Sequence, residues 1–410
     1  MKSDLDALMQ AHHIDAVLVS GPGQHNPMMV YLTGGGHLTV ADLIKKRGDA
    51  AVLFHAPMER DEAARTGLDT RSYLKYPEFR AALRGDMEQS ARMLQKMLQD
   101  CGFTTGRLAV YGQVDARQFY GTISRLQHLM PAIEIADGPD ENVLLMAMAT
   151  KDADEVARIQ KMGRITTEVV AETADLLSGS TVKDGMLVKP DGQPLTIGDV
   201  KRQIDLWLMA RGAENPEGTI FAIGRDAGVP HSTGSAADVL RLGETIVFDI
   251  FPCEAGGGYF HDFTRTWCLG FAPDAALKLY EQVRSVYETI TTELAVGTPF
   301  FAYQKRTCEL FEDMGHTTVL SDPSTETGYV HSLGHGVGLK VHELPMCSYQ
   351  TEGSLANILA TGQVIAVEPG LYYPEQGMGV RLENTFYISP EGQFVNLAPY
   401  PLDLVLPVKG

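Results

Sequence analysis

The sequence predicts a mixed α/β protein (α/β or α+β) with two domains, and three observations support this fold class. The chain has 410 residues, more than one hydrophobic core usually serves. Segments typical of helices and of strands alternate through its first part. From about Thr219 onward the pattern changes to short strand-like runs separated by glycines. We therefore expect an N-terminal α/β domain over residues 1–150 and a second domain over residues 151–410.

Hydrophobic periodicity predicts the elements of the first domain. Helices are expected at Leu5–Ile14, Met87–Asp100 and Ala116–Leu129, and strands at Ala16–Ser20, Met29–Leu32, Ala50–Phe54 and Arg107–Tyr111. The run Gly34-Gly35-Gly36 predicts a turn, because no helix start follows it as a phosphate loop requires. No cluster of reactive residues stands out in this domain, and Ala136–Asp140 predicts the break that ends it.

The second domain begins with helices and continues with strands. Helical spacing predicts helices over Ala153–Leu177 and Ile197–Arg211. A single further helix, Ala275–Leu294, is expected to interrupt the later strand-like runs. The chain therefore combines an α/β first domain with a strand-rich second one.

Composition narrows the classes of partner and compartment. The chain has 34 basic and 52 acidic residues, a net charge of −18, which repels polyanions and argues against nucleic acid as a partner. Its five cysteines are scattered without a C-x-x-C pair, as is typical of a reducing compartment. The acidic start lacks the pattern of a signal peptide, and no apolar run approaches the roughly 20 residues of a membrane span. We expect a cytoplasmic protein that does not bind membranes.

Four acidic residues of the second domain lie in surroundings that are unusually apolar for carboxylates. Asp249, Asp262, Glu368 and Glu383 each end or interrupt a strand-like run rich in aliphatic, aromatic or β-branched residues. A carboxylate in such a place faces a desolvation cost of several kcal/mol, and a capped turn or an ion pair would explain any one of them. If all four converge, their repulsion requires protons or cations. Two divalent ions would balance the four charges and could share a hydroxide nucleophile.

Histidines supply the fifth candidate ligand. His331, His335 and His342 fall within twelve residues, and glycines flank His335 on both sides. The pair His342-Glu343 does not begin a zincin helix, because Pro345 would break that helix and Met346 replaces the second histidine. Four oxygen donors and one nitrogen favour manganese, cobalt, iron or zinc over copper, without choosing among them.

Other catalytic motifs are missing from the sequence. There is no G-x-S-x-G elbow and no Walker loop, so the serine hydrolase and P-loop classes are excluded. Gly256-Gly257-Gly258 precedes a strand-like run, which argues against a dinucleotide site.

At these residues the sequence resembles the prolidase, aminopeptidase P and methionine aminopeptidase family, whose catalytic domain has the pita-bread fold. The resemblance spans roughly residues 155–400 and rests on the ligand order Asp, Asp, His, Glu, Glu. It also rests on four motifs: D-x-T-R-T at Asp262–Thr266, H-G-x-G-L-x-V-H-E at His335–Glu343, V-E-P-G at Val367–Gly370 and G-V-R-x-E-N at Gly379–Asn384. The N-terminal domain, with Tyr31-Leu32-Thr33-Gly34, is similar to the creatinase-type domain of prolidases and aminopeptidase P.

The resemblance implies an Xaa-Pro peptidase, either a dipeptidase or an aminopeptidase, that acts on proline-containing peptides and is commonly a homodimer. It implies two divalent metal ions, with manganese as the first choice, held by Asp249, Asp262, His335, Glu368 and Glu383. Asp262 and Glu383 would bridge the two ions. The catalytic residues that it implies are Glu368 as proton shuttle, His342 and His231 at the substrate, His331 as a further active-site histidine, and Arg381 beside the last ligand.

Three departures from the family pattern bear on substrate choice. Asp249 and Asp262 stand 13 positions apart, slightly more than is usual in the family. Ile250-Phe251-Pro252 replaces the glycine common after the first ligand. Met346 stands where several prolidases carry an arginine that is thought to hold the substrate's carboxylate, which leaves aminopeptidase activity open.

Two other functions remain as alternatives. One is a metal-dependent amidohydrolase that cleaves a C–N bond in a small non-peptide substrate on the same fold. The other is a non-catalytic binding protein, which the complete ligand set disfavours. A creatinase-like enzyme is disfavoured for the same reason, because creatinase lacks the metal ligands.

Overall fold

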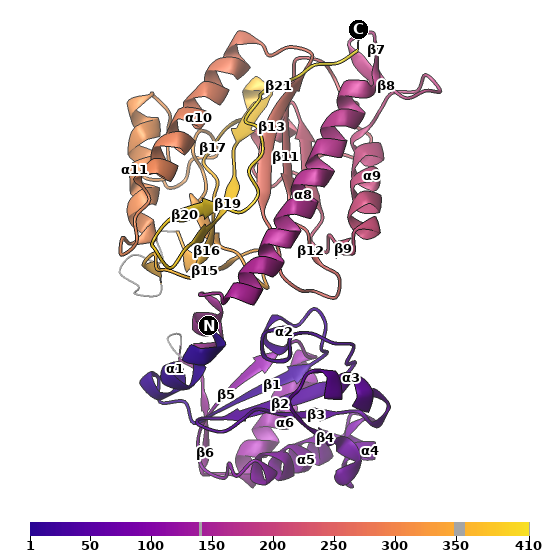
Figure 1. The fold of residues 1–410 in the computed structure, drawn as a ribbon, viewed down its shortest axis with the longest axis vertical. Coiled ribbons are helices and arrows are strands. Elements are labelled where there is room, and N and C mark those ends of the chain that lie inside the picture. The colour runs from indigo at the N-terminus through magenta and orange to yellow at the C-terminus, as the bar shows by residue number, and fades with distance from the viewer. Residues whose placement is uncertain (139–141, 348–356, 410) are drawn as a thin grey trace. The chain divides into compact units, whose positions relative to one another are not determined.

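A computed structural model describes residues 1–138, 142–347 and 357–409 of the chain (Figure 1). The chain divides into two compact units. The N-terminal unit comprises Met1–Met148 together with Gly256–Gly258, and the C-terminal unit holds the remaining residues. Of the predicted break at Ala136–Asp140, Pro139 and Asp140 lie outside the described residues.

The N-terminal unit is built on one mixed sheet of six strands in the order β4-β3-β2-β1-β5-β6. The strands are β1 (Ala16–Gly21), β2 (Ala41–Lys46), β3 (Val52–His55), β4 (Asp69–Ser72), β5 (Gly106–Gly112) and β6 (Ile133–Ala136). Strand β1 is antiparallel to β2 and parallel to β5. Strands β2 to β4 are added on one side of β1 and strands β5 and β6 on the other, so the strand order reverses at β1.

Helices cover both faces of this sheet (Figure 1). They are α1 (Leu5–Ala11), α2 (Pro27–Thr33), α3 (Arg60–Arg65), α4 (Phe79–Ala82), α5 (Met87–Asp100), α6 (Ala116–Leu129) and α7 (Val143–Met148). The side chains of α5 and α6 form a core with alternate residues of β1, such as Ala16 and Leu18. Asp86 caps α5 by accepting from the N–H groups of Glu88 and Gln89.

One predicted strand of this unit is wrong. Met29–Leu32 belongs to helix α2, whose first residue is Pro27 and whose C-cap, Gly34, has φ +82°. Four apolar residues fit a buried strand or a helix equally well, and the helix start at Asn26-Pro27 and stop at Gly34 decide the outcome. Strand β2 was not predicted, and helix α1 ends at Ala11, before the expected Ile14.

The C-terminal unit contains two main sheets. One has the order β10-β11-β13-β21, and the other has the order β15-β14-β16-β19-β20. Their strands are β10 (Thr219–Ile223), β11 (Thr245–Ile250), β13 (Phe263–Leu269), β21 (Val405–Leu406), β14 (Gly334–Gly336), β15 (Glu343–Met346), β16 (Val364–Val367), β19 (Asn384–Ile388) and β20 (Phe394–Asn396). Smaller pairs are β7 (Thr181–Lys183) with β8 (Met186–Val188), β9 (Ala213–Glu214) with β12 (Cys253–Glu254), and β17 (Gly370–Tyr373) with β18 (Met378–Arg381).

The helices of this unit pack on the outside of the sheets (Figure 1). They are α8 (Ala153–Gly179), α9 (Ile197–Ala210), α10 (Asp274–Glu293) and α11 (Phe300–Asp313). Helices α8 and α9 share a core with β10, β11 and β13, whereas α10 and α11 share one with β16 and β17. Each main sheet therefore has its own pair of covering helices.

The expectation of a single helix after Thr219 is wrong, because α11 follows α10. Its buried side chains recur at helical spacing, at Phe300, Tyr303, Gln304, Thr307, Cys308 and Phe311. Two members of that stripe are polar, which weakens its apolar pattern in the sequence. Gln304 is nonetheless buried, because it donates to the carbonyl of His331 and accepts from the N–H of Leu333.

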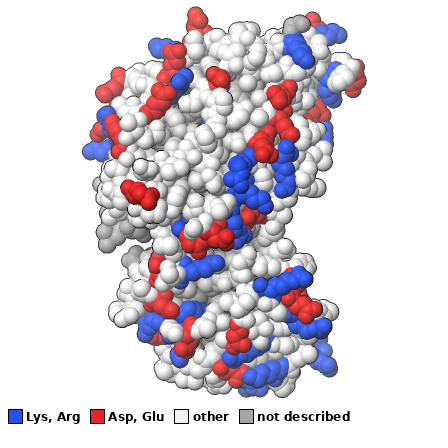
Figure 2. Space-filling view, in the orientation of Figure 1, with Lys and Arg blue, Asp and Glu red and all other residues white. Residues whose placement is uncertain are grey.

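Two properties of the surface and helices bear on partners. On the face drawn in Figure 2, acidic and basic side chains are interspersed, and no broad area there is exclusively basic. Within the described ranges, every helix is too short or too polar to cross a bilayer.

Candidate metal centre

The four unusual carboxylates and His335 lie on the wall of one cavity of about 220 Å³ in the C-terminal unit. The strands of the two main sheets position them. The cavity is lined by Glu217, Ile220, His231, Thr233, Asp249, Phe251, Asp262, His335, Val341, His342, Glu368, Arg381 and Glu383.

The first sheet contributes the two aspartates. Asp249 lies in β11 and pairs with Thr264 of β13 in antiparallel register. Asp262 directly precedes β13, and its Oδ1 accepts a hydrogen bond of 2.9 Å from the N–H of Phe263. The hairpin-like pairing of β11 with β13 therefore brings together two carboxylates that stand 13 positions apart in the sequence.

The second sheet contributes the other three residues. His335 lies in β14 opposite Ala366 of β16, and Glu368 follows β16 directly. Glu383 stands between β18 and β19 rather than inside one continuous strand. The N–H of Glu383 donates to the carbonyl of Thr264 at 3.1 Å, and this bond joins the two sheets beside the cavity.

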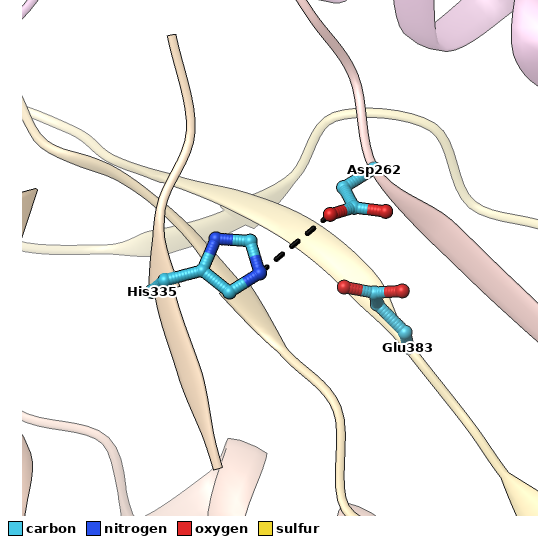
Figure 3. Close-up of side chains that lie close together, drawn as sticks. All are labelled: Asp262, His335 and Glu383. Atoms are coloured by element: carbon cyan, nitrogen blue, oxygen red, sulfur yellow. Dashed lines mark ion pairs between the residues drawn. The ribbon is translucent and has the colours of Figure 1, made fainter. Parts of the chain in front are cut away.

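Three of these residues form the tightest group. One ligand atom from each of Asp262, His335 and Glu383 lies within 4.8 Å of the others, and all three side chains are buried. Figure 3 shows the His335 ring directed at both carboxylates, each side chain coming from a different segment. Nε2 of His335 is 3.6 Å from Oδ2 of Asp262 and 3.5 Å from Oε1 of Glu368. These distances are too long for good hydrogen bonds.

Burial and mutual repulsion raise the pKa of three of the carboxyl groups. The pKa of Asp262 is well above its usual range, first because the group is desolvated and then because Glu383 and Asp249 lie nearby. Burial and the charge of Glu383 do the same to the pKa of Glu368. The pKa of Glu383 is raised to about 8 by burial and by Asp249. The cavity thus disfavours negative charge unless protons or cations enter it.

His335 is neutral and presents a free lone pair to the carboxylates. Burial, followed by the nearby His342, lowers the pKa of His335 to about 3. Its Nδ1 lies 3.1 Å from the carbonyl of Gly336, to which it donates, so the proton is assigned to Nδ1. Nε2 is then an acceptor, as a metal-binding imidazole requires.

The donor set fits divalent metal ions. Oδ1 of Asp249 and Oε1 of Glu383 are buried without a hydrogen-bond partner among the described residues. Buried carboxylate oxygens without donors are costly, and a bound cation removes that cost. Oxygen ligands with one imidazole suit manganese, cobalt, iron or zinc.

Among the residues that line the cavity, Arg381 is the only lysine or arginine, and each of its three guanidinium nitrogens donates a hydrogen bond. Nη2 donates to Oδ2 of Asp249 at 2.6 Å, and Nη1 donates to the hydroxyl of Tyr372 at 2.7 Å. Nη1 also donates to the carbonyl of Pro230 at 3.2 Å. Arg381 therefore orients Asp249 and neutralises one charge, leaving the others uncompensated.

The three other predicted histidines fall into two groups. His231 and His342 line the cavity, and the ring of His342 lies 4.2 Å from that of His335. His331 is not among the lining residues. Its Nε2 accepts from the hydroxyl of Tyr372 at 2.8 Å, and its Nδ1 donates to the carbonyl of Ser332 at 2.7 Å. His331 thus supports Tyr372 and, through it, Arg381, and makes no contact with the cavity.

Sequence reasoning missed a buried ion pair that shapes the turn before β15. Nζ of Lys151 lies 3.0 Å from Oε2 of Glu343, and both side chains are 1% exposed. Oε1 of Glu343 accepts from the N–H groups of Leu339 and Lys340 at 2.8 and 3.1 Å. A Cβ on Gly338 would lie 2.3 Å from this carboxylate, so only glycine fits there. The pair fixes the turn that carries His342.

Glu217 and the apolar wall were also missed. Glu217 is exposed at the cavity, and Ile220, Phe251 and Val341 supply apolar contacts. Glu217 stands in a loop of mixed polarity, so no local pattern distinguishes it from other surface acids. The motif H-G-x-G-L-x-V-H-E contained Val341, but its role in lining the cavity is visible only in the fold.

Comparison with known proteins agrees with this geometry. Residues 157–390, more than half of the chain, match the model of metallopeptidase family M24. The chain is 26% identical over 390 residues to an Xaa-Pro dipeptidase of Pyrococcus horikoshii, covering 94% of this chain and 93% of that relative. It is 31% identical over 198 residues to an Xaa-Pro dipeptidase of Pyrococcus furiosus, covering 47% of this chain and 51% of that relative.

Solved structures share the fold over nearly the full length. The prolidase of Pyrococcus furiosus superimposes with a TM-score of 0.72 at 22% identity, covering 97% of this chain and 99% of that one. The X-Pro aminopeptidase of Thermotoga maritima superimposes with a TM-score of 0.71 at 21% identity, covering 95% of this chain and 97% of that one. The predicted fold class, an N-terminal α/β domain followed by a pita-bread domain, is confirmed. The predicted family is confirmed as well: the chain belongs to metallopeptidase family M24.

Proposed function

We propose that this metallopeptidase is a dinuclear enzyme that hydrolyses Xaa-Pro peptide bonds, as an Xaa-Pro dipeptidase or an Xaa-Pro aminopeptidase. The observation that carries the proposal is one cavity lined by four candidate ligand carboxylates and a neutral imidazole, in which Arg381 is the only lysine or arginine among the lining residues. The names of the relatives, Xaa-Pro dipeptidase and X-Pro aminopeptidase, support the same bond specificity.

Asp249, Asp262, His335, Glu368 and Glu383 would hold two divalent ions, with manganese as the first choice. Two such ions, when bound, would supply Lewis acidity toward the scissile carbonyl and would lower the pKa of water toward neutrality. Two orphaned carboxylate oxygens, on Asp249 and Glu383, support ligand roles on both sides of the cavity.

The remaining groups bind the substrate and move its proton. Glu368 follows β16 at the cavity wall and would carry a proton to the leaving proline nitrogen. His342 and His231 would donate hydrogen bonds to the developing oxyanion, an interaction often worth about 3 kcal/mol. Arg381, held by Tyr372 and ordered by His331, keeps Asp249 in place.

The lining supports substrates longer than dipeptides. A dipeptide places its free carboxylate beside the cavity, where a cation would normally receive it. Arg381 is already bonded to Asp249 and Tyr372, and no lysine stands among the described lining residues. We expect Xaa-Pro-Yaa peptides to be cleaved at least as fast as Xaa-Pro dipeptides. The homodimer and the cytoplasmic location stay predictions, and light scattering tests the first.

An assay of the manganese-loaded protein on Ala-Pro, Ala-Pro-Ala and Ala-Ala-Ala tests the proposal. Hydrolysis of the proline peptides with Ala-Ala-Ala left intact supports it. Hydrolysis of no peptide would contradict it and favour the amidohydrolase alternative.

A pair of variants tests the role of Glu368. We expect Glu368→Gln to lower the rate at least ~100-fold without changing thermal stability by more than a few degrees. Glu375→Gln, a change at an exposed glutamate, is the matched control and should leave the rate unchanged. Equal rates in the two variants would remove Glu368 from the proton-transfer role.

A further inference from the structure

The N-terminal unit contains a cavity of about 440 Å³, which is larger than the catalytic one. Its volume falls within the ~300–1,000 Å³ typical of small-molecule sites. It is formed by the ends of β1 and β5, the start of β2, and side chains of α4, α5 and α6. None of its lining residues belongs to the metal centre.

The cavity lies where open α/β sheets usually bind ligands. Strands β2, β3 and β4 follow one another on one side of β1 in the sheet, and β5 and β6 lie on its other side. Beyond the carboxyl ends of the parallel strands β1 and β5, the chain enters α2 and α6, which lie on opposite faces of the sheet (Figure 1). Such a topological switch point opens a crevice at the carboxyl edge of the sheet.

The walls are mostly apolar, and apolar side chains remain exposed at the rim. Phe79, Met93, Leu94 and Phe119 line the interior. Val40, Leu83 and Val114 belong to the same lining and are 48%, 68% and 41% exposed. Large exposed apolar residues around a hollow are typical of binding sites rather than of an ordinary surface.

The carboxyl group of Asp42 lies among these apolar walls. The hydroxyl of Ser20 donates to Oδ1 of Asp42 at 2.5 Å, and the hydroxyl of Tyr73 donates to Oδ2 at 2.7 Å. Tyr73 is 1% exposed, so packing around its ring holds its hydroxyl in place. Each carboxylate oxygen has further lone pairs that these two donors do not use.

Among the described residues, no lysine, arginine or histidine forms an ion pair with Asp42. The described residues that line the cavity include two acids, Asp42 and Asp115, but no lysine, arginine or histidine. Asp42 takes part in none of the ion pairs found in the described part of the chain. A negative ligand would meet two acids and no counter-charge, whereas a cation with an apolar body would match both the walls and Asp42.

From this arrangement we propose that the N-terminal unit binds a small apolar primary amine, whose ammonium group donates to Asp42 and whose hydrocarbon body fills the cavity. This site is separate from the metal centre, and it does not depend on the proposed peptidase specificity.

Binding of matched probes to the full-length protein tests the proposal. 2-Phenylethylamine, 2-phenylethanol and 3-phenylpropanoate share an aromatic body and differ in charge. We expect the amine to bind at least about tenfold more tightly than the alcohol, and the carboxylate to bind weakest. A crystal soaked with the amine should show it against Asp42. Density only in the acidic catalytic cavity, or equal affinity for the three probes, would overturn the proposal.

Two pairs of variants identify the site in solution. Asp42→Asn should remove the preference for the amine over the alcohol, whereas Asp61→Asn, at a carboxylate that is 83% exposed, should leave it unchanged. If Asp42→Asn fails to fold, Leu83→Lys at the rim replaces it, with Leu74→Lys at an exposed site outside the cavity as its control. We expect Leu83→Lys to weaken amine binding at least about fivefold by charge repulsion and Leu74→Lys to have no effect. An amine preference that survives in a folded Asp42→Asn variant would contradict the assignment, and so would amine binding that Leu83→Lys leaves unchanged.

Discussion

The two units of this molecule handle acidic groups in apolar surroundings in different ways. In the N-terminal unit, each oxygen of the Asp42 carboxyl group accepts a hydrogen bond from a hydroxyl group. In the C-terminal unit, the four candidate ligand carboxylates share one cavity, and two of their buried oxygens receive no donor from the described residues. Hydrogen-bond donors suffice for one acid, but a cluster of acids needs cations, because each acid raises the pKa of the next. The difference supports the proposal that the cluster holds metal ions.

Metal removal gives the largest expected effect. Chelation followed by dialysis should abolish peptidase activity, and manganese should restore it, because the carboxylates alone supply no Lewis acid. At a concentration 100-fold above its dissociation constant, one bound ion should also stabilise the fold by about 2.7 kcal/mol. Thermal unfolding with and without manganese measures this. Unchanged activity after full chelation would contradict the claim that the carboxylate cluster of the C-terminal unit needs cations.

Loss of the Lys151 cation should destabilise the C-terminal unit strongly. Lys151→Met leaves Glu343 buried without its counter-charge, which typically costs about 3–5 kcal/mol. Arg284→Met removes an exposed pair with Glu288 and should cost less than about 0.5 kcal/mol. Urea unfolding of both variants provides the measurement. Equal losses would show that the buried pair does not fix the turn that carries His342.

The pH dependence of stability should differ between the metal-free and metal-loaded protein. The pKa values of Asp262, Glu368 and Glu383 are raised in the folded protein, so these groups bind more protons there than in the unfolded chain. The free energy of unfolding of the metal-free protein therefore falls as the pH rises. Buried histidines with lowered pKa values, among them His335, oppose this below about pH 6.5.

Between about pH 6.5 and 8 the histidines no longer contribute to the pH dependence of stability, and the clustered carboxyl groups determine it, since the pKa of Glu383 is about 8. There the metal-free protein should lose stability, by at most about 1.4 kcal/mol per pH unit for each proton released. Manganese should abolish the loss. Urea unfolding at pH 6.5, 7.2 and 8 follows it, and a metal-free stability that stays flat or rises over this range would argue against clustered acids.

The isolated acid should give the smallest effect. Asp42→Asn keeps the size of the side chain and an oxygen acceptor, so the free energy of unfolding should change by about 1 kcal/mol or less. Burial raises the pKa of Asp42, whereas the hydrogen bonds from Ser20 and Tyr73 act in the opposite direction. A loss as large as that of Lys151→Met would show that Asp42 has a structural role like that of the buried ion pair.

Long and well-capped elements were predictable from the sequence. Helix α8 begins at the predicted Ala153, because Asp152 and Glu155 form a capping box at its start. Helix α2 was mistaken for a strand because its apolar run is short, and α11 was missed because Gln304 and Thr307 interrupt its buried stripe. In these cases tertiary contacts decide the outcome.

Convergence of the five candidate ligands on one cavity followed from acids in strand-like runs and from the family motifs. The sequence could not separate His331, which orders Tyr372, from His342, which lines the cavity. Nor could it pair Lys151 with Glu343 across 192 positions, because no local pattern encodes such a contact. The site residues and their metals stay a prediction until ions are measured.

Metal content per chain tests the central claim most directly. The protein is loaded with manganese, desalted and analysed by elemental mass spectrometry beside the Glu383→Gln variant. Two ions per chain in the natural protein, with fewer in the variant, is the predicted result. No bound metal, or a content that is the same in both proteins, would contradict a centre built on these carboxylates.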